Sequence, residues 1–320
     1  MEALASQFAL QFSKSVPLFV LMALGYGLSR WGGFPKAASA ALSRFALYVA
    51  LSSMLFRLMS RIFSSGITAD LRLLVAFFGA CGLVFLAGRL FVTRCLRLAP
   101  VDGVVFATGG VFSNNGMLGL PLALAMLGEP AMPSVAAVLS VNAMILWTLA
   151  SVAVELARGG SLEPRQLLAA AKNVFSNPLI IAIFSGVCWG LTGLGLPAVV
   201  DEPLRLLGDS ATPLCLVVVG MGLAEFGVRF DASGLALSAT KLLAMPASVF
   251  ALASLLGLGR TETVAVTFLG GLPMAVNVYL MARHYGACER IVSNAMVATT
   301  VASAFTVPLI VTLLNFHYGP

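Results

Sequence analysis

Ten long apolar runs, more than any single motif, limit what this chain can fold into. They cover residues 8–29, 38–60, 71–93, 103–127, 132–156, 173–193, 203–226, 235–257, 261–283 and 289–314. A helix needs about 20 apolar residues to cross the ~30 Å hydrocarbon layer of a membrane. Because backbone polar groups in lipid must be paired within the segment itself, such runs are expected to be helical. The sequence therefore predicts an all-α integral membrane protein with ten transmembrane helices.

The composition agrees with a lipid-facing surface. Of the 320 residues, 59% are hydrophobic and only 10% are charged, whereas soluble domains usually carry about a quarter charged residues. The net charge is +6, but the basic residues stand singly between apolar runs. A nucleic-acid partner is therefore not expected, since it would require a basic patch. The five cysteines form no CxxC pair, and we predict no metal site and no cofactor.

One polar segment divides the chain into halves of five predicted spans each. We interpret residues 1–157 as a first five-helix repeat, 158–172 as a cytoplasmic connecting loop and 173–320 as a second five-helix repeat. Five crossings are an odd number, so the second half must enter the membrane from the side opposite to the first. If the halves are related, they form two inverted repeats.

The distribution of Lys and Arg predicts how the chain is oriented. With the N-terminus outside, thirteen basic residues fall on the inner side, Lys241 among them, and six on the outer side. Cytoplasmic loops carry an excess of Lys and Arg. We therefore expect a multi-pass protein of the cytoplasmic (inner) membrane with both termini extracytoplasmic.

Two spans, the fourth of each half, contain residues that interrupt helices. The first interruption includes Gly116, Gly119 and Pro121, and the second includes Pro273 after a glycine pair. Proline removes a backbone hydrogen bond and clashes with the preceding turn, and glycine adds backbone freedom. We predict that both helices, numbers 4 and 9, are broken near their middles at these helix-break residues.

Polar side chains accompany both interruptions. Ser113, Asn114 and Asn115 lie in the first and Asn277 in the second. A pair of ordinary proline kinks is the simpler interpretation. However, irregular backbone at membrane depth is tolerated only inside protein or beside a polar cavity, and matched interruptions in two halves are typical of transporter binding sites. We predict that these four residues bind the substrate.

Two titratable residues are candidates for ion coupling. Asp209 lies in the seventh predicted span beside hydroxyl residues, and His284 lies at the end of the ninth. Ionisable groups inside a membrane are usually functional, and histidine titrates in the physiological range. Hydration near the membrane surface is the alternative for Asp209, and a structural or exposed role is the alternative for His284.

Three stretches carry a resemblance to a known family. Asn114-x-Gly116-x-x-Gly119-x-Pro121-Leu122, Pro273-x-x-x-Asn277 and residues 209–220 resemble signature segments of the auxin efflux carrier family. The resemblance implies two inverted five-helix repeats whose broken helices cross at mid-membrane, a layout shared with the bile acid–sodium symporter fold. The short central loop is similar to that of bacterial members, which include malonate and other dicarboxylate permeases. A homodimer is compatible with this fold.

These observations favour a secondary transporter that moves a small organic anion, such as a carboxylate, by alternating access. A channel-like protein and a sodium-coupled symporter of the same fold remain alternatives. An enzyme is not expected, because the two histidines lie near helix ends and Asp209 is the only candidate for an intramembrane acid.

Proton coupling is predicted in preference to sodium coupling, since neither interruption contains Asp or Glu. Uncoupled uniport driven by the membrane potential is the other alternative. No buried Lys or Arg is predicted near either break. Half-helix N-termini would attract the anion without one.

Overall fold

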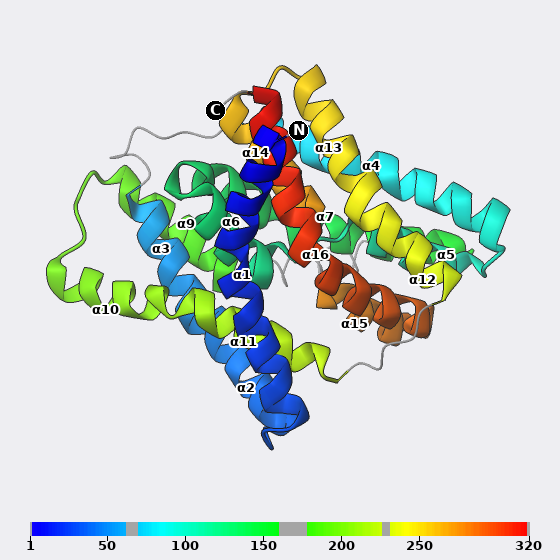
Figure 1. Cartoon of the computed structure of the whole chain (residues 1–320), viewed down its shortest axis with the longest axis horizontal. Coiled ribbons are helices and arrows are strands. Elements are labelled where there is room, and N and C mark those ends of the chain that lie inside the picture. Colours follow the sequence, from blue (N-terminus) through cyan, green and yellow to red (C-terminus); the bar gives the residue numbers. More distant parts are fainter. Residues whose placement is uncertain (1, 62–69, 160–177, 226–230, 319–320) are drawn as a thin grey trace.

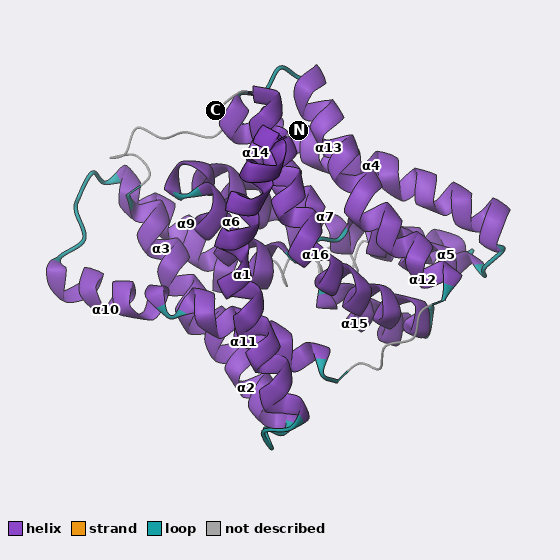
Figure 2. Cartoon of the chain, viewed as in Figure 1, coloured by secondary structure: helices purple, strands orange, loops and turns teal. Residues whose placement is uncertain are grey.

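The fold is described from a computed structural model, which places residues 2–61, 70–159, 178–225 and 231–318. Helices account for nearly all of these residues, and loops are short (Figure 2). The all-helical prediction is confirmed for this part of the chain. Most of the predicted connecting loop 158–172 and the start of the sixth predicted span, from 173, lie outside the described residues.

In the described part of the first half there are seven α-helices and several short π- or 3₁₀-helical segments. In chain order these are α1 (Glu2–Arg30), α2 (Lys36–Phe45), η1 (Ala46–Leu51), α3 (Ser52–Ser60), α4 (Arg72–Phe91), η2 (Val92–Leu96), α5 (Pro100–Val111), η3 (Asn115–Gly119), α6 (Leu120–Leu127), η4 (Glu129–Ala131) and α7 (Met132–Ala157). The segments α2, η1 and α3 follow one another without a gap and form one continuous helix.

The second half is built in the same manner. Its elements are α9 (Pro178–Leu191), α10 (Ala198–Asp209), α11 (Ala211–Leu223), α12 (Ala232–Ala239), η5 (Thr240–Ala244), α13 (Met245–Leu255), α14 (Arg260–Gly271), α15 (Val276–Tyr285) and α16 (Glu289–Tyr318). Here α12, η5 and α13 form one continuous helix.

Within the described residues, seven helical stretches are long and apolar enough to cross a membrane. They are Leu4–Arg30, Lys36–Ser60, Arg72–Leu96, Glu129–Ala157, Ala198–Leu223, Ala232–Leu255 and Glu289–Tyr318. Each coincides with one of the predicted spans. The fourth and ninth predicted spans do not qualify because each is interrupted, and the sixth is described only from Pro178 onward. Seven spans are therefore supported by length and hydropathy.

The predicted seventh span, 203–226, consists of two helices that meet at Ser210. Pro213 explains the junction, because proline has no N–H for the carbonyl of Asp209 and its ring clashes with the residue four positions earlier. Helix α11 instead begins with the bond from the Leu214 amide to the Ser210 carbonyl. Helix α10 consequently runs in a different direction from α11 (Figure 1).

Helices from the two halves pack against each other. Helix α1 packs on α11, α3 on α9, and α4 on α13, and Figure 1 shows α4 and α13 side by side. The contact between α1 and α11 is closest at Gly25 and Gly220, where an added Cβ would meet backbone atoms of Val217 and Met22. The two halves thus form a single body, with helices of both halves around the interrupted segments.

Candidate functional site

The two interrupted helices cross, and their extended segments pair with each other. The amide of Asn114 donates to the carbonyl of Pro273, and the amide of Ala275 donates to the carbonyl of Phe112, each at 2.9 Å. Ser113 and Met274 form an isolated antiparallel bridge between these bonds. Backbone groups that the breaks release are therefore satisfied by the opposite segment, as irregular backbone at membrane depth requires.

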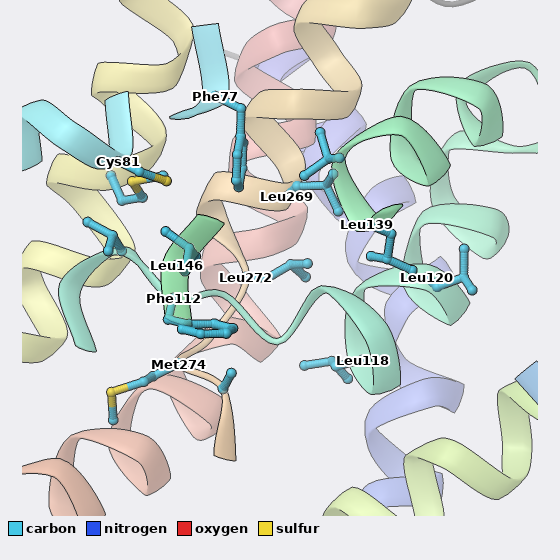
Figure 3. Close-up of a cluster of buried hydrophobic side chains, with 14 of the residues drawn as sticks. Phe77, Cys81, Phe112, Leu118, Leu120, Leu139, Leu146, Leu269, Leu272 and Met274 are labelled. Carbon is cyan, nitrogen blue, oxygen red and sulfur yellow. The ribbon is translucent and has the colours of Figure 1, made fainter. Parts of the chain in front are cut away.

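Apolar side chains surround this crossing. Figure 3 shows Phe112 and Met274 on the two extended segments, with Leu118 and Leu272 nearby, and all four are buried. The amide of Met274 is satisfied from a third direction, since it donates to the hydroxyl of Thr299 on α16 at 3.2 Å. The crossing is thus fixed both by its own hydrogen bonds and by packing.

Beyond the crossing, two half-helices begin without side-chain caps. The segment η3–α6 starts at Asn115 and α15 starts at Val276. Neither N-cap residue, Asn114 or Ala275, places a side-chain cap on its helix. The first amides of a helix have no intrahelical partner, and the N-terminus carries about half a positive charge. Both starts line the same cavity, so they offer it two positive helix ends.

This cavity has a volume of about 980 Å³ and contains all four predicted binding residues, Ser113, Asn114, Asn115 and Asn277. Its walls are mixed, with mostly apolar side chains from α7, α9, α11 and α16 and polar ones from the breaks, from α2 and, singly, from α7 and α16. Ligand sites for small molecules are usually apolar pockets with a few convergent polar groups. The cavity has this character and lies directly at the crossing.

Several polar atoms in the cavity wall are buried without a hydrogen-bond partner. They are the hydroxyl of Ser113, both side-chain atoms of Asn115 and the amide oxygen of Asn142. Leaving such a group unpaired costs about 1–3 kcal/mol, so a cluster of them at one cavity indicates a place where a polar ligand or water binds. Asn142, on α7, was missed by the sequence analysis because a single Asn in an otherwise apolar span carries no local signal.

The predicted helix-break residues have different positions. Pro273 lies in the extended segment itself, whereas Gly116 and Gly119 lie in the π-helical turn η3 and Pro121 at the start of α6. A Cβ on Gly119 would collide with Leu272. Gly119 therefore allows the two broken helices to approach each other closely, and the chain interruption itself precedes it.

The two candidate coupling residues lie away from the cavity. Asp209 is exposed and pairs with Arg205 at 2.8 Å; it lines a separate pocket of about 340 Å³. His284 is exposed near the end of α15, with its ring against Tyr285. The structure does not bring either residue to the crossing.

One prediction about the breaks is wrong. We expected no buried Lys or Arg near either break, and Lys241 was assigned to the inner side. Its side chain is instead completely buried, and its ammonium donates to the carbonyl of Gly270, at the end of α14, at 2.5 Å. The sequence misleads here because Lys241 follows the start of α12 by only nine residues, so the charge count places it at the inner end of its span.

The cavity opens at one end of the bundle. Its lining includes Lys36, whose side chain is 79% exposed and pairs with Glu225 at 3.7 Å. At the other end of the same continuous helix, Arg57 and Arg61 both bind Asp201 on α10 at 2.7 Å. The helix α2–η1–α3 therefore runs from an open cavity mouth to an end that is held together by ion pairs.

An apolar helical bundle with crossed, interrupted helices beside a cavity with a few convergent polar groups defines the class of integral membrane transport proteins. More narrowly, residues 11–311 match the model of the membrane transport protein family, so the chain belongs to this family, that of the auxin efflux carriers. The match covers most of the chain and includes both interruptions.

Similar proteins come from distant organisms. The chain is 28% identical to a Rhizobium meliloti protein named "Putative malonate transporter", over 91% of this chain and 92% of that protein. It is 23% identical to "Uncharacterized transporter MJ1031" of Methanocaldococcus jannaschii, over 91% and 95%. It is 22% identical to "Uncharacterized transporter YfdV" of Escherichia coli K12, over 92% and 94%. All three are named as transporters.

Proposed function

We propose that this protein is a secondary transporter that moves a small carboxylate across the cytoplasmic membrane by alternating access. The observation that carries the proposal is the set of unpartnered polar atoms of Ser113, Asn115 and Asn142 around one cavity, at the start of two uncapped half-helices. The positive helix ends and the two unpartnered donors, the Ser113 hydroxyl and the Asn115 side-chain nitrogen, suit an anion, and the apolar remainder of the wall suits a short carbon chain.

The same proposal includes the topology. The seven long spans, together with the interrupted segments 100–127 and 260–285 and the short helix α9, would make ten crossings in two inverted repeats, 1–157 and 173–320. Both termini would be extracytoplasmic. The cavity mouth at Lys36 and Glu225 would then face the cytoplasm, and the ion pairs of Arg57 and Arg61 with Asp201 would close the outer end.

Malonate is the first substrate to test, because a relative is named for it. We propose further that any coupling uses protons in preference to sodium, since within the described residues the cavity lining holds a single carboxylate, that of Glu225 at its mouth. Sodium would need several hard oxygen ligands close together.

The deciding experiment is uptake of labelled malonate, malate and indole-acetate into proteoliposomes under imposed pH or sodium gradients. Asn114→Ala and Asn277→Ala should each reduce apparent affinity, since loss of a buried amide partner costs about 1–3 kcal/mol, or roughly 5- to 150-fold. Saturable uptake of a carboxylate that both variants weaken supports the proposal. Preference for a neutral or cationic solute, strict sodium dependence, or unchanged kinetics in both variants would contradict it.

A further inference from the structure

The crossing has a second face, opposite the cavity, where two helices end. Helix α5 ends at Val111 and α14 ends at Gly271. The last carbonyls of a helix lack intrahelical partners and carry about half a negative charge. In transporters with broken helices, such C-terminal ends and unwound carbonyls coordinate the coupling cation. This face is therefore where an exchangeable cation would be expected to bind.

The π-helical segment η5 occupies that position. Thr240 of η5 lies against Gly110, near the end of α5, where an added Cβ would come within 2.9 Å of its Cγ2 atom. The neighbouring residue, Lys241, reaches the end of α14 and donates to the Gly270 carbonyl at 2.5 Å. One turn of helix thus approaches both negative helix ends, and it carries a lysine to them.

The position of Lys241 in the membrane is unusual. It follows the N-cap Asp231 of its helix by ten residues, or about 15 Å along the axis, so it lies near the middle of a ~30 Å hydrocarbon layer. Its side chain is 0% exposed. A charged side chain at such a depth is costly and is retained where it has a function.

No counter-charge explains this lysine. Among the described residues, Lys241 forms no ion pair with a carboxylate, and its hydrogen bond goes to a backbone carbonyl. The helices packed around η5 are α4, α5, α14 and α16, and Cys81 on α4 is the titratable side chain close enough to interact with its charge. The partner of the ammonium is therefore the negative end of α14.

We propose that Lys241 is a built-in cation, which occupies with its ammonium the place that an exchangeable coupling cation would take at the C-terminal ends of the broken helices. The inference rests on the proposed transport function but concerns a different face of the crossing. The tethered ammonium keeps Gly270 and the following break in position, and it makes this face independent of sodium.

The test uses the purified full-length protein and three variants. Lys241→Ala removes the ammonium and leaves space for an ion. Lys241→Met fills the space without a charge, and Asn277→Ala changes the cavity face as a control. Thermal unfolding is measured in NaCl and in choline chloride, and again with n-propylammonium, which matches the atoms that Lys241→Ala removes. The neutral probe 1-propanol has the same length.

The expected result is that sodium or n-propylammonium raises the unfolding temperature of Lys241→Ala but not that of the wild type, Lys241→Met or Asn277→Ala. Propanol should have no such effect. In proteoliposomes, Lys241→Met should lose malonate uptake by roughly tenfold or more, since hydrogen bonds of charged groups are the strong ones, and n-propylammonium should restore uptake to Lys241→Ala.

Two outcomes would overturn the inference. The first is a folded Lys241→Ala protein whose unfolding temperature responds equally to propanol and to n-propylammonium, or to none of sodium, propanol and n-propylammonium. The second, which decides the matter if Lys241→Ala does not fold, is uptake by Lys241→Met at the wild-type rate. The thermal measurements use no substrate, so they stand even if malonate is not transported and the proposed function fails on that account.

Discussion

The two faces of the crossing are built from the same two broken helices but carry opposite electrostatic character. On the cavity face, η3–α6 and α15 begin without side-chain caps, and polar atoms such as those of Asn115 have no partner. On the opposite face, α5 and α14 end, and Lys241 meets the Gly270 carbonyl. The positive ends of η3–α6 and α15 face the open cavity, whereas the negative end of α14 faces the side-chain nitrogen of Lys241.

A broken helix supplies two sites at once, a positive helix N-terminus and a negative helix C-terminus. This chain leaves the first open to a ligand and fills the second with Lys241. Unsatisfied donors at the cavity cost stability unless a ligand binds them. A lysine that is already bonded to a helix end needs no ligand. We therefore expect substitutions on the cavity face to change affinity first and substitutions on the opposite face to change the stability of the fold first.

The largest expected effect comes from reversing the electrostatic character of the cavity face. Asn277→Asp adds a negative charge with almost no change in shape. At roughly 5 Å from a bound carboxylate and an effective dielectric constant of about 20, the repulsion is about 3 kcal/mol, or roughly 200-fold in affinity. Malonate uptake at several concentrations measures it. An effect no larger than that of Asn277→Ala would show that the anion does not bind near this residue.

A second variant tests whether the cavity face is open for a ligand at the cost of stability. In Asn115→Leu, two buried unpartnered atoms are replaced by a side chain of similar size. Without substrate the unfolding temperature should rise, because an unpaired buried polar group costs about 1–3 kcal/mol. Malonate affinity should fall, by roughly tenfold. A variant that is both less stable and fully active would mean that Asn115 is a structural residue.

The third prediction concerns packing at the opposite face. A Cβ in Gly110→Ala would come within 2.9 Å of Thr240, and η5 would have to move with Lys241. Such overpacking costs about 1–3 kcal/mol, measurable as a lower unfolding temperature. Gly82→Ala is the matched control, since nothing lies within 4 Å of its Cβ and alanine favours a helix by up to ~1 kcal/mol. Equal behaviour of the two variants would argue against tight contact here.

The smallest effects are expected for the two candidate coupling residues that lie on neither face. Asp209 forms an exposed pair with Arg205, and such pairs contribute about 0–1 kcal/mol. Asp209→Asn and His284→Gln should each leave malonate uptake within about twofold of wild type. A loss of pH-driven uptake in either variant, with folding intact, would show that the substituted residue takes part in proton coupling at a site away from the crossing.

Much of the cavity face could be predicted from the sequence, and the opposite face could not. Proline, glycine and asparagine mark the breaks by their local backbone chemistry, so Ser113, Asn114, Asn115 and Asn277 could be predicted to lie together, and the structure places all four at one cavity. Lys241 reaches the break by tertiary packing of a separate helix, at a separation of 29 positions from Gly270 in sequence. No residue next to Lys241 in the sequence indicates its contact with Gly270.

The limits of the fold prediction have similar causes. Apolar runs predicted the positions of seven long helices, because hydrophobic length is a property of one segment. The change of direction at Ser210 depends on Pro213 and on the packing of α10 beside α3. A hydropathy pattern merges these two helices, since the stretch across their junction is apolar enough as a whole to qualify as one span.

The reciprocal hydrogen bonds at the crossing also impose an order of events on synthesis. The amide of Asn114 can donate to the carbonyl of Pro273, and the carbonyl of Phe112 can accept from the amide of Ala275, only after these later residues have been synthesised. These partners are made about 160 residues later, which at ~5–20 residues per second takes roughly 8 to 30 s. During that interval the first broken helix is in the membrane or at its surface with unpaired backbone groups. The final structure of the fourth span can therefore form only after most of the chain has left the ribosome.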